Sequence, residues 1–303
     1  MRNFIIIKLL LPLYCETKTK TMKTLTILTF LTLSSFVIGQ TKWNEFNKLV
    51  NQKDLAAIDK YISVWEAESP NAGDLYLAKF VYFRNRGLGQ QAFAASDKGL
   101  KVIDEKSIQM ALKICERGRI DNPSRVDFFT ESIQLLLDLK RFDAANPYIL
   151  KWINDSQSIS KPWLTSENNP IEDPDFLYKQ ICNYIDVWLL TKDIDQGHFV
   201  ALDFAVAYAQ NYPADPNSLY LLGKVNYQLE NLSESEMVLL KLLSRSPNHI
   251  EALFLMGYIT KKTGQFDRSL SYFKSIKKQG VKSERRRAKT EIKALKKERK
   301  AAR

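Results

Sequence analysis

The chain has 303 residues, of which 45% are hydrophobic and 26% are charged, and its formal net charge is +11. Residues 1–39 carry a net charge of +4 and residues 277–303 a net charge of +10, which leaves −3 for residues 40–276. The isoelectric point of 9.3 therefore reflects the two ends of the chain, and the nearly neutral central part excludes a surface that is basic throughout. Residues 40–303 contain only two cysteines, which excludes a disulfide framework.

Residues 22–40 have the parts of a secretory signal peptide. A Met-Lys start is followed by an apolar run from Leu25 to Ile38 and by a small residue, Gly39, at a possible cleavage point. We therefore predict an exported protein, periplasmic or secreted, that is cleaved near Gly39/Gln40. Because the apolar run of about 14 residues is shorter than the ~20 that span a bilayer, an anchor formed by an uncleaved segment is the alternative.

Residues 1–21 hold a second apolar run followed by a polar stretch. We interpret residues 1–21 as sequence translated in frame from upstream of the true start codon, and Met22 as the true start of translation. Cys15 follows the bulky Tyr14, which argues against a lipid-modified cysteine. Residues 1–39 are therefore treated as the signal region.

Residues 40–154 give short amphipathic segments with little strand alternation, which predicts helical hairpins. Asp54 and Asp74 precede apolar segments and are predicted N-caps. A two-helix unit is visible at 122–154, where Pro147 should kink the second helix or shift its start.

Residues 155–174 break the helical pattern with serine, asparagine and three prolines, and we predict a linker or loop. Two interpretations of this segment remain, a flexible hinge and an ordered loop that lies in a groove. Trp163 favours partial anchoring, because a large apolar ring in a free linker would stay exposed. The simplest expectation is a surface connection with this ring packed on a neighbouring helix.

Residues 175–280 repeat at an interval of 34 residues, a period typical of stacked helix-turn-helix units. The small residues in the pattern fit a close crossing of the two helices of a unit, where a larger side chain would hold them apart. Glu230-Asn231 and Gly264-Gln265 suit the tight turn between the helices. The recurring positions are Leu222-Gly223 with Met256-Gly257, Leu232 with Phe266, Ser235 with Ser269, and Leu239 with Phe273.

This pattern resembles the tetratricopeptide repeat, with units at about 178–213, 216–247 and 250–280. The resemblance implies an all-α fold, a right-handed α-solenoid of helix-turn-helix repeats, with degenerate units of the same kind in residues 40–154. Cys115 and Cys182 lie in apolar helical stretches, and we expect small core residues rather than a bridge.

Residues 281–303 are rich in helix formers and cations, and we predict a basic C-terminal helix. Its thin apolar stripe of Ala288, Ile292 and Leu295 suits a solubilising cap on the last repeat. The other interpretation is electrostatic contact with an anionic membrane surface or an acidic partner, while nucleic acid is not expected for an exported chain. The cations assigned to such a contact are Arg285, Arg286, Arg287, Lys296 and Lys297.

The sequence has no pattern for catalysis. The two histidines, His198 and His249, have no carboxylate or cysteine at ligand spacing, and no phosphate loop, GxSxG or CxxC motif is found. We predict a non-enzymatic protein with no metal and no cofactor. An enzyme on a helical scaffold is the alternative, and it would need a deep pocket with converging polar groups.

The resemblance also implies where a partner would bind. In that family the first helix of each unit lines a concave groove, and aromatic rings among a few charges suit an extended peptide or a partner helix. We therefore expect an adaptor or scaffold for a protein or peptide partner, or a membrane-tethered assembly factor if the N-terminal segment stays uncleaved. Packing of the rings against the next repeat is the alternative. The implied positions are Asn183, Asp186, Asn217, Tyr220, Lys224, Tyr227, Glu251, Phe254, Tyr258 and Lys261.

Overall fold

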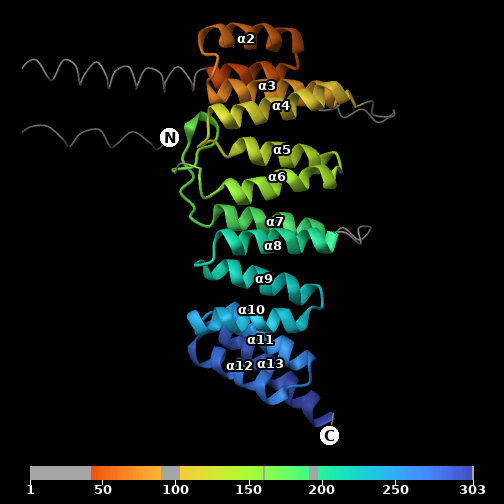
Figure 1. Cartoon of the computed structure of the whole chain (residues 1–303), viewed down its shortest axis with the longest axis vertical. Coiled ribbons are helices and arrows are strands. Elements are labelled where there is room, and N and C mark those ends of the chain that lie inside the picture. The colour runs from red at the N-terminus through yellow and green to blue at the C-terminus, as the bar shows by residue number, and fades with distance from the viewer. Residues whose placement is uncertain (1–41, 90–102, 160, 191–196, 302–303) are drawn as a thin grey trace, which may run out of the picture.

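The computed structural model describes residues 42–89, 103–159, 161–190 and 197–301. The predicted signal peptide and the predicted start at Met22 lie outside the described residues. Within these ranges the chain is helical and contains no β-strand. The all-α solenoid is thereby confirmed, and Figure 1 shows the helices stacked in chain order along one long axis.

Residues 42–52 form a first helix, and loops and tight turns separate those that follow. The labelled helices of the N-terminal part are α2 (Leu55–Glu68), α3 (Gly73–Gly87), α4 (Glu105–Asp121), α5 (Asp127–Asp138) and α6 (Phe142–Asp155). After the short 3-10 helix η2 (Ser166–Asn168) come α7 (Phe176–Leu190), α8 (Gly197–Asn211), α9 (Pro216–Gln228), α10 (Leu232–Arg245), α11 (Ile250–Lys262), α12 (Phe266–Gln279) and α13 (Lys282–Ala301).

Antiparallel pairs are the building units of the stack. α3 packs on α4, α5 on α6, α7 on α8, α9 on α10 and α11 on α12. The first helices of successive units also touch, since α7 contacts α9, α9 contacts α11 and α11 contacts α13. Each unit thus contacts mainly its neighbours, as in a solenoid.

The predicted close crossing of the two helices is confirmed in both C-terminal units. A Cβ atom on Gly223 would lie 2.7 Å from the Leu239 side chain, and one on Gly257 would lie 2.6 Å from the Phe273 ring. The turns also follow the prediction, because Glu230 and Gly264 have φ angles of 64° and 75°. Small residues and left-handed turn residues therefore set the geometry of the repeat.

The first half departs from the expected helix starts. Asp54 caps α2 as predicted, and its carboxylate accepts from two backbone N–H groups. The prediction for Asp74 is wrong, because Ala72 is the N-cap of α3 and the Asp74 carboxylate instead accepts from Arg125. Pro147 lies inside α6, which begins at Phe142, so the proline does not shift the helix start.

The loop between α6 and α7 is fastened to the N-terminal units. Trp163 is 8% exposed and belongs to the main core cluster, and Leu164 exchanges backbone hydrogen bonds with Ser124 and Val126. The Glu167 N–H donates to the Asp74 carboxylate at 3.0 Å. The anchoring expected from Trp163 is therefore observed, while the division of the chain at residues 155–174 stays a prediction.

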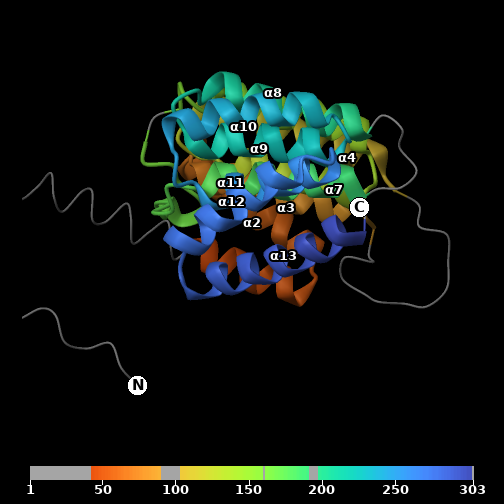
Figure 2. The ribbon, with the colours of Figure 1, turned by 90° about the horizontal axis from the view of Figure 1, so that it is seen from below.

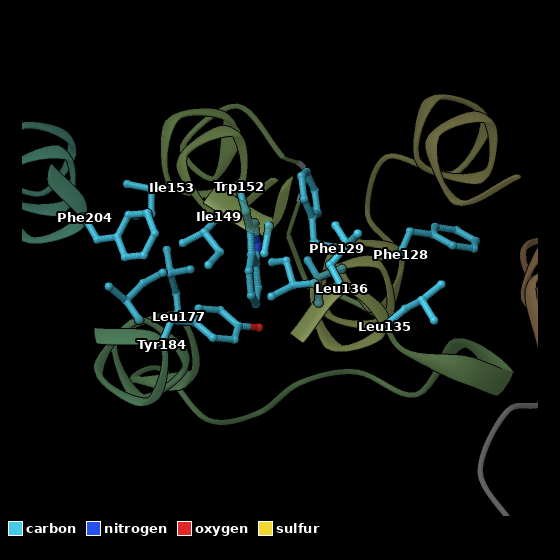
Figure 3. Packing of buried hydrophobic residues seen from close by; sticks show 14 of the residues in the cluster. Phe128, Phe129, Leu135, Leu136, Ile149, Trp152, Ile153, Leu177, Tyr184 and Phe204 are labelled. Atoms are coloured by element: carbon cyan, nitrogen blue, oxygen red, sulfur yellow. The ribbon is translucent and has the colours of Figure 1, made fainter. Parts of the chain in front are cut away.

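The main core runs through the middle of the stack. Trp152 is fully buried and stacks on Phe129 with a centroid distance of 5.7 Å, and Tyr184 and Phe204 continue the contacts toward α7 and α8 (Figure 3). Cys115 is buried in this cluster as expected, and Cys182 is partly buried at its edge. Both cysteines are free thiols.

Candidate partner-binding face

The candidate face is formed by the first helices of three successive units, α7, α9 and α11. On α7, Tyr178, Cys182 and Asp186 are spaced four residues apart and therefore share one side of the helix. Asp186 reaches the next unit, since the Lys224 ammonium on α9 lies 3.6 Å from its carboxylate. The two side chains are 48% and 31% exposed, so this ion pair is open to solvent and to a partner.

Tyr178 and Cys182 were missed as members of this face. The Tyr178 hydroxyl contacts the Cys182 thiol, and burial raises the pKa of that thiol above its ordinary value. The thiol is therefore neutral near pH 7 and is a weak nucleophile. Its spacing of four residues from Asp186 was the signal in the sequence, but the apolar surroundings of Cys182 indicated a core residue.

Tyr220 and Tyr227 on α9 make contacts with the next unit. The Tyr220 ring lies 5.3 Å from the His249 ring, and His249 caps α11 by accepting from the Ala252 N–H through Nδ1. The Lys262 ammonium lies 5.8 Å from the Tyr227 ring. Both tyrosines remain partly exposed, so packing against the next repeat leaves part of each ring free.

Phe254, Tyr258 and Lys261 on α11 are covered by the C-terminal helix. Phe254 is 4% exposed, and the Arg287 guanidinium lies 4.1 Å from its ring centre. Tyr258 donates to Glu291 at 3.2 Å, and Lys261 pairs with Glu298 at 2.7 Å. Phe254 is therefore unavailable to a ligand while α13 is docked, and the other two are engaged by the chain itself.

The C-terminal helix α13 is packed and not a free tail. Ala288 and Leu295 are buried and Ile292 is partly buried, in a cluster with residues of α11 and α12. The predicted apolar stripe thus covers the last repeat. Among the cations predicted for an electrostatic contact, Arg287 lies over α11 and Arg285 donates to the Gly280 carbonyl. Arg286, Lys296 and Lys297 are exposed without an ion pair to the described residues.

The remaining predicted positions lie on α7, in the first turn of α9 and in the first turn of α11. Asn183 is exposed, and the Asn217 N–H donates to the carboxylate of Asp215, the N-cap of α9. The Glu251 side chain is 59% exposed, 3.7 Å from His249 Nδ1. The part of the predicted face that stays accessible is therefore on α7, α9 and the first turn of α11.

Other kinds of site are less well supported in the described residues. No group of three or more histidine, cysteine or acidic side chains in the described ranges could hold a metal ion, and none of the helices there is long and apolar enough to cross a membrane. A cavity of about 140 Å³ lies between α4, α5 and α6, lined by Cys115, Arg119, Phe129 and Tyr148 among others. This volume is below the several hundred Å³ of ordinary small-molecule sites.

A family model described as tetratricopeptide repeat matches residues 216–249, which include α9 and α10. The match covers one helix-turn-helix unit of the chain, and the packing described above is that of a helical solenoid. No curated protein matches the sequence.

Three solved structures illustrate the likeness. YrrB, described as a TPR protein with an unusual peptide-binding site, is 11% identical with a TM-score of 0.39, over 76% of this chain and 97% of that chain. TTC0263, a TPR protein from Thermus thermophilus, is 15% identical with a TM-score of 0.38, over 70% and 98%. PilW, a type IV pilus biogenesis factor, is 13% identical with a TM-score of 0.39, over 85% and 98%.

Proposed function

We propose that this protein is a non-enzymatic scaffold that binds an extended peptide or a helix of a partner protein across α7 and α9. The observation that carries the proposal is the half-exposed Asp186–Lys224 pair with the partly exposed Tyr220 ring on the same helix as Lys224. Exposed charges beside partly buried aromatic rings are typical of peptide-recognition surfaces. The tetratricopeptide-repeat match at residues 216–249 supports a protein partner.

Capture of the partner from an envelope extract by the full chain tests this proposal. Lys224→Glu should abolish capture, because it places two acidic groups together at the centre of the face. Lys241→Glu is the matched control, since Lys241 is exposed on α10 and the change in net charge is the same. A partner that Lys224→Glu and Tyr220→Ala both retain would contradict the proposal.

Cysteine labelling gives a second readout on the purified complex. Cys182 lies on the face and is partly exposed, whereas Cys115 is buried in the core and serves as an internal reference. A partner bound across α7 and α9 should slow the reaction of Cys182 with a maleimide and leave the slow reaction of Cys115 unchanged. An equal rate at Cys182 with and without partner would place recognition elsewhere.

We also propose that the scaffold is exported and acts in the periplasm or at the envelope. The support is the signal-peptide pattern of residues 22–40, with cleavage near Gly39/Gln40. Mass spectrometry of the native N-terminal peptide tests it, with a mature start near Gln40 as the expected result. A peptide from before Met22 would contradict the assigned start, and a protein that resists carbonate extraction would indicate an uncleaved membrane anchor.

A further inference from the structure

Helix α13 separates its charges between an inner and an outer side. All three of its glutamates are engaged: Glu284 accepts from the Val281 N–H at 2.6 Å, Glu291 accepts from Tyr258, and Glu298 pairs with Lys261. On the side of α13 that faces the last repeat, Arg299 also forms a bidentate ion pair with Asp267 on α12. Glu284 therefore caps the start of the helix, whereas Glu291 and Glu298 hold it to α11, and no acidic group of the helix is left without a partner.

The remaining cations of α13 form one row, which we call the outer basic row. Apart from the adjacent Lys296 and Lys297 they recur every three or four residues, and they therefore share a single side of the helix. All are exposed, and none has an ion pair to a carboxylate of the described chain. At 1.5 Å per residue the row extends over roughly 27 Å. Its members are Lys282, Arg286, Lys289, Lys293, Lys296, Lys297 and Lys300.

Helix stability does not explain this row. Like charges four residues apart destabilise a helix, and the row contains several such pairs, for example Lys289 with Lys293 and Lys296 with Lys300. A cap that served only solubility could alternate its charges and avoid this cost. A local arrangement that opposes stability indicates a role outside the fold.

The kind of cation indicates the kind of ligand. Arg285, Arg287 and Arg299 make the fixed contacts of α13 with a carbonyl, two rings and a carboxylate, whereas the outer basic row consists of lysines except for Arg286. A lysine ammonium is a mobile point charge without the planar fork that reads a defined carboxylate or phosphate geometry. Such a row suits a diffuse, extended layer of negative charge.

The position and surroundings of α13 also suit an extended surface. It is the last helix of the stack, and in the view along the long axis it lies at the margin away from α8 and α10 (Figure 2). An open hollow at its start is lined by Val281, Lys282, Ser283, Arg286, Arg287 and Thr290. Lysine and arginine side chains can donate charge-assisted hydrogen bonds to phosphate oxygens.

We propose that the outer basic row binds the surface of a bilayer rich in anionic phospholipid headgroups. Four to eight Lys or Arg residues on one side of a surface helix are enough for such attachment. The contact would hold the C-terminal end of the solenoid at the membrane and leave α7 and α9 free. The proposal does not depend on a partner at those helices, because the row belongs to a different surface.

Co-sedimentation of the full chain with vesicles tests the proposal. Vesicles of phosphatidylcholine and phosphatidylglycerol in equal parts are compared with vesicles of phosphatidylcholine alone. Reversal of three charges, Lys289→Glu with Lys293→Glu and Lys296→Glu, should weaken binding to the anionic vesicles at least about tenfold. Added salt should weaken the binding of the unchanged protein.

The matched control reverses three exposed lysines elsewhere, Lys106→Glu with Lys113→Glu and Lys241→Glu, and it should bind like the unchanged protein. This pair of variants has equal net charge and the same N-terminal segment, so any difference between them belongs to the row. An unchanged thermal transition shows that both are folded.

The corresponding lysine-to-glutamine triple variant should weaken binding by a smaller factor. Equal binding of both glutamate variants, no binding to anionic vesicles, or equal binding to neutral vesicles would overturn the proposal. If the glutamate variant of the outer basic row lost binding to an RNA or DNA duplex but bound vesicles like the unchanged protein, the row would be assigned to nucleic acid and the proposal would be overturned.

Discussion

The Ser235 hydroxyl donates a hydrogen bond of 2.7 Å to the carbonyl oxygen of Gly223, across the crossing of α9 and α10. One period later the Ser269 hydroxyl donates to Gly257 at the same distance. Both serines are fully buried. The small residues of the repeat therefore act as a pair, because glycine allows the close approach and serine bonds to the carbonyl exposed by it.

Gly257→Ala should destabilise the protein by about 1–3 kcal/mol, because the added methyl group would overlap the Phe273 ring. Urea unfolding followed by circular dichroism measures the change. Ser271→Ala, at an exposed position of α12, is the control and should leave the midpoint within error. An unchanged midpoint for Gly257→Ala would show that the helices can separate at no cost.

Arg125→Met should destabilise the protein by about 3–5 kcal/mol, because it leaves the buried carboxylates of Asp74 and Asp127 without their cation. Burial already raises the pKa of Asp127, and a raised native-state pKa means that stability falls as the pH rises through it. The loss should therefore be larger at neutral than at acidic pH. Unfolding of the variant and of Arg86→Met, an exposed control, at both pH values checks this.

Glu105→Gln should remove a contribution to the free energy of unfolding that depends on pH. The Arg141 guanidinium donates to both carboxylate oxygens and lowers the pKa of Glu105 to about 2 from the ordinary 4.5. A lowered pKa stabilises the fold above pH 4.5 and loses this effect as the pH falls toward 2.

The size of this effect is limited, because the Glu105 side chain is 53% exposed and such pairs contribute about 0–1 kcal/mol. Thermal unfolding at a series of pH values should show the two proteins converging in acid. Glu116→Gln, at an exposed position of α4, is the control. A difference between unchanged and variant protein that persists at the lowest pH would contradict the assignment.

Leu295→Ala should destabilise the C-terminal end by about 2–5 kcal/mol, because Leu295 is 2% exposed against the apolar residues of α11 and α12. Since each unit contacts mainly its neighbours, amide exchange should quicken in α11 and α12 and stay unchanged in α3. Lys296→Ala, at the exposed adjacent position, is the control. Faster exchange along the whole stack would contradict this local coupling.

The sequence predicted the features that depend on neighbouring residues or on the period. The glycine and serine positions, the turns at Glu230 and Gly264, and the apolar stripe of α13 all follow from local spacing. The accessible part of the candidate face includes predicted positions on α7, α9 and the start of α11, and packing of the rings was the stated alternative, but the cover of Phe254 by Arg287 was not predicted. A groove that is free and a groove that the next helix fills have the same pattern of aromatic and charged residues in the sequence, so the sequence alone does not distinguish them.

Long-range polar contacts could not be predicted in the same way. Asp74 has the sequence pattern of a helix cap, and only the fold shows Arg125, far along the chain, beside its carboxylate. Arg286 and Arg287 are adjacent in the sequence, yet one is solvent-facing and the other lies over two rings. Helix geometry separates them by about 100°, and only the docking of α13 decides which of them contacts the rings of α11.

α13 contacts α11, the first helix of the last unit, as α11 contacts α9, the first helix of the unit before it. The contact between Phe254 and Arg287 joins residues 33 positions apart, almost one full period. α13 therefore takes the place on α11 that the first helix of a further unit would have.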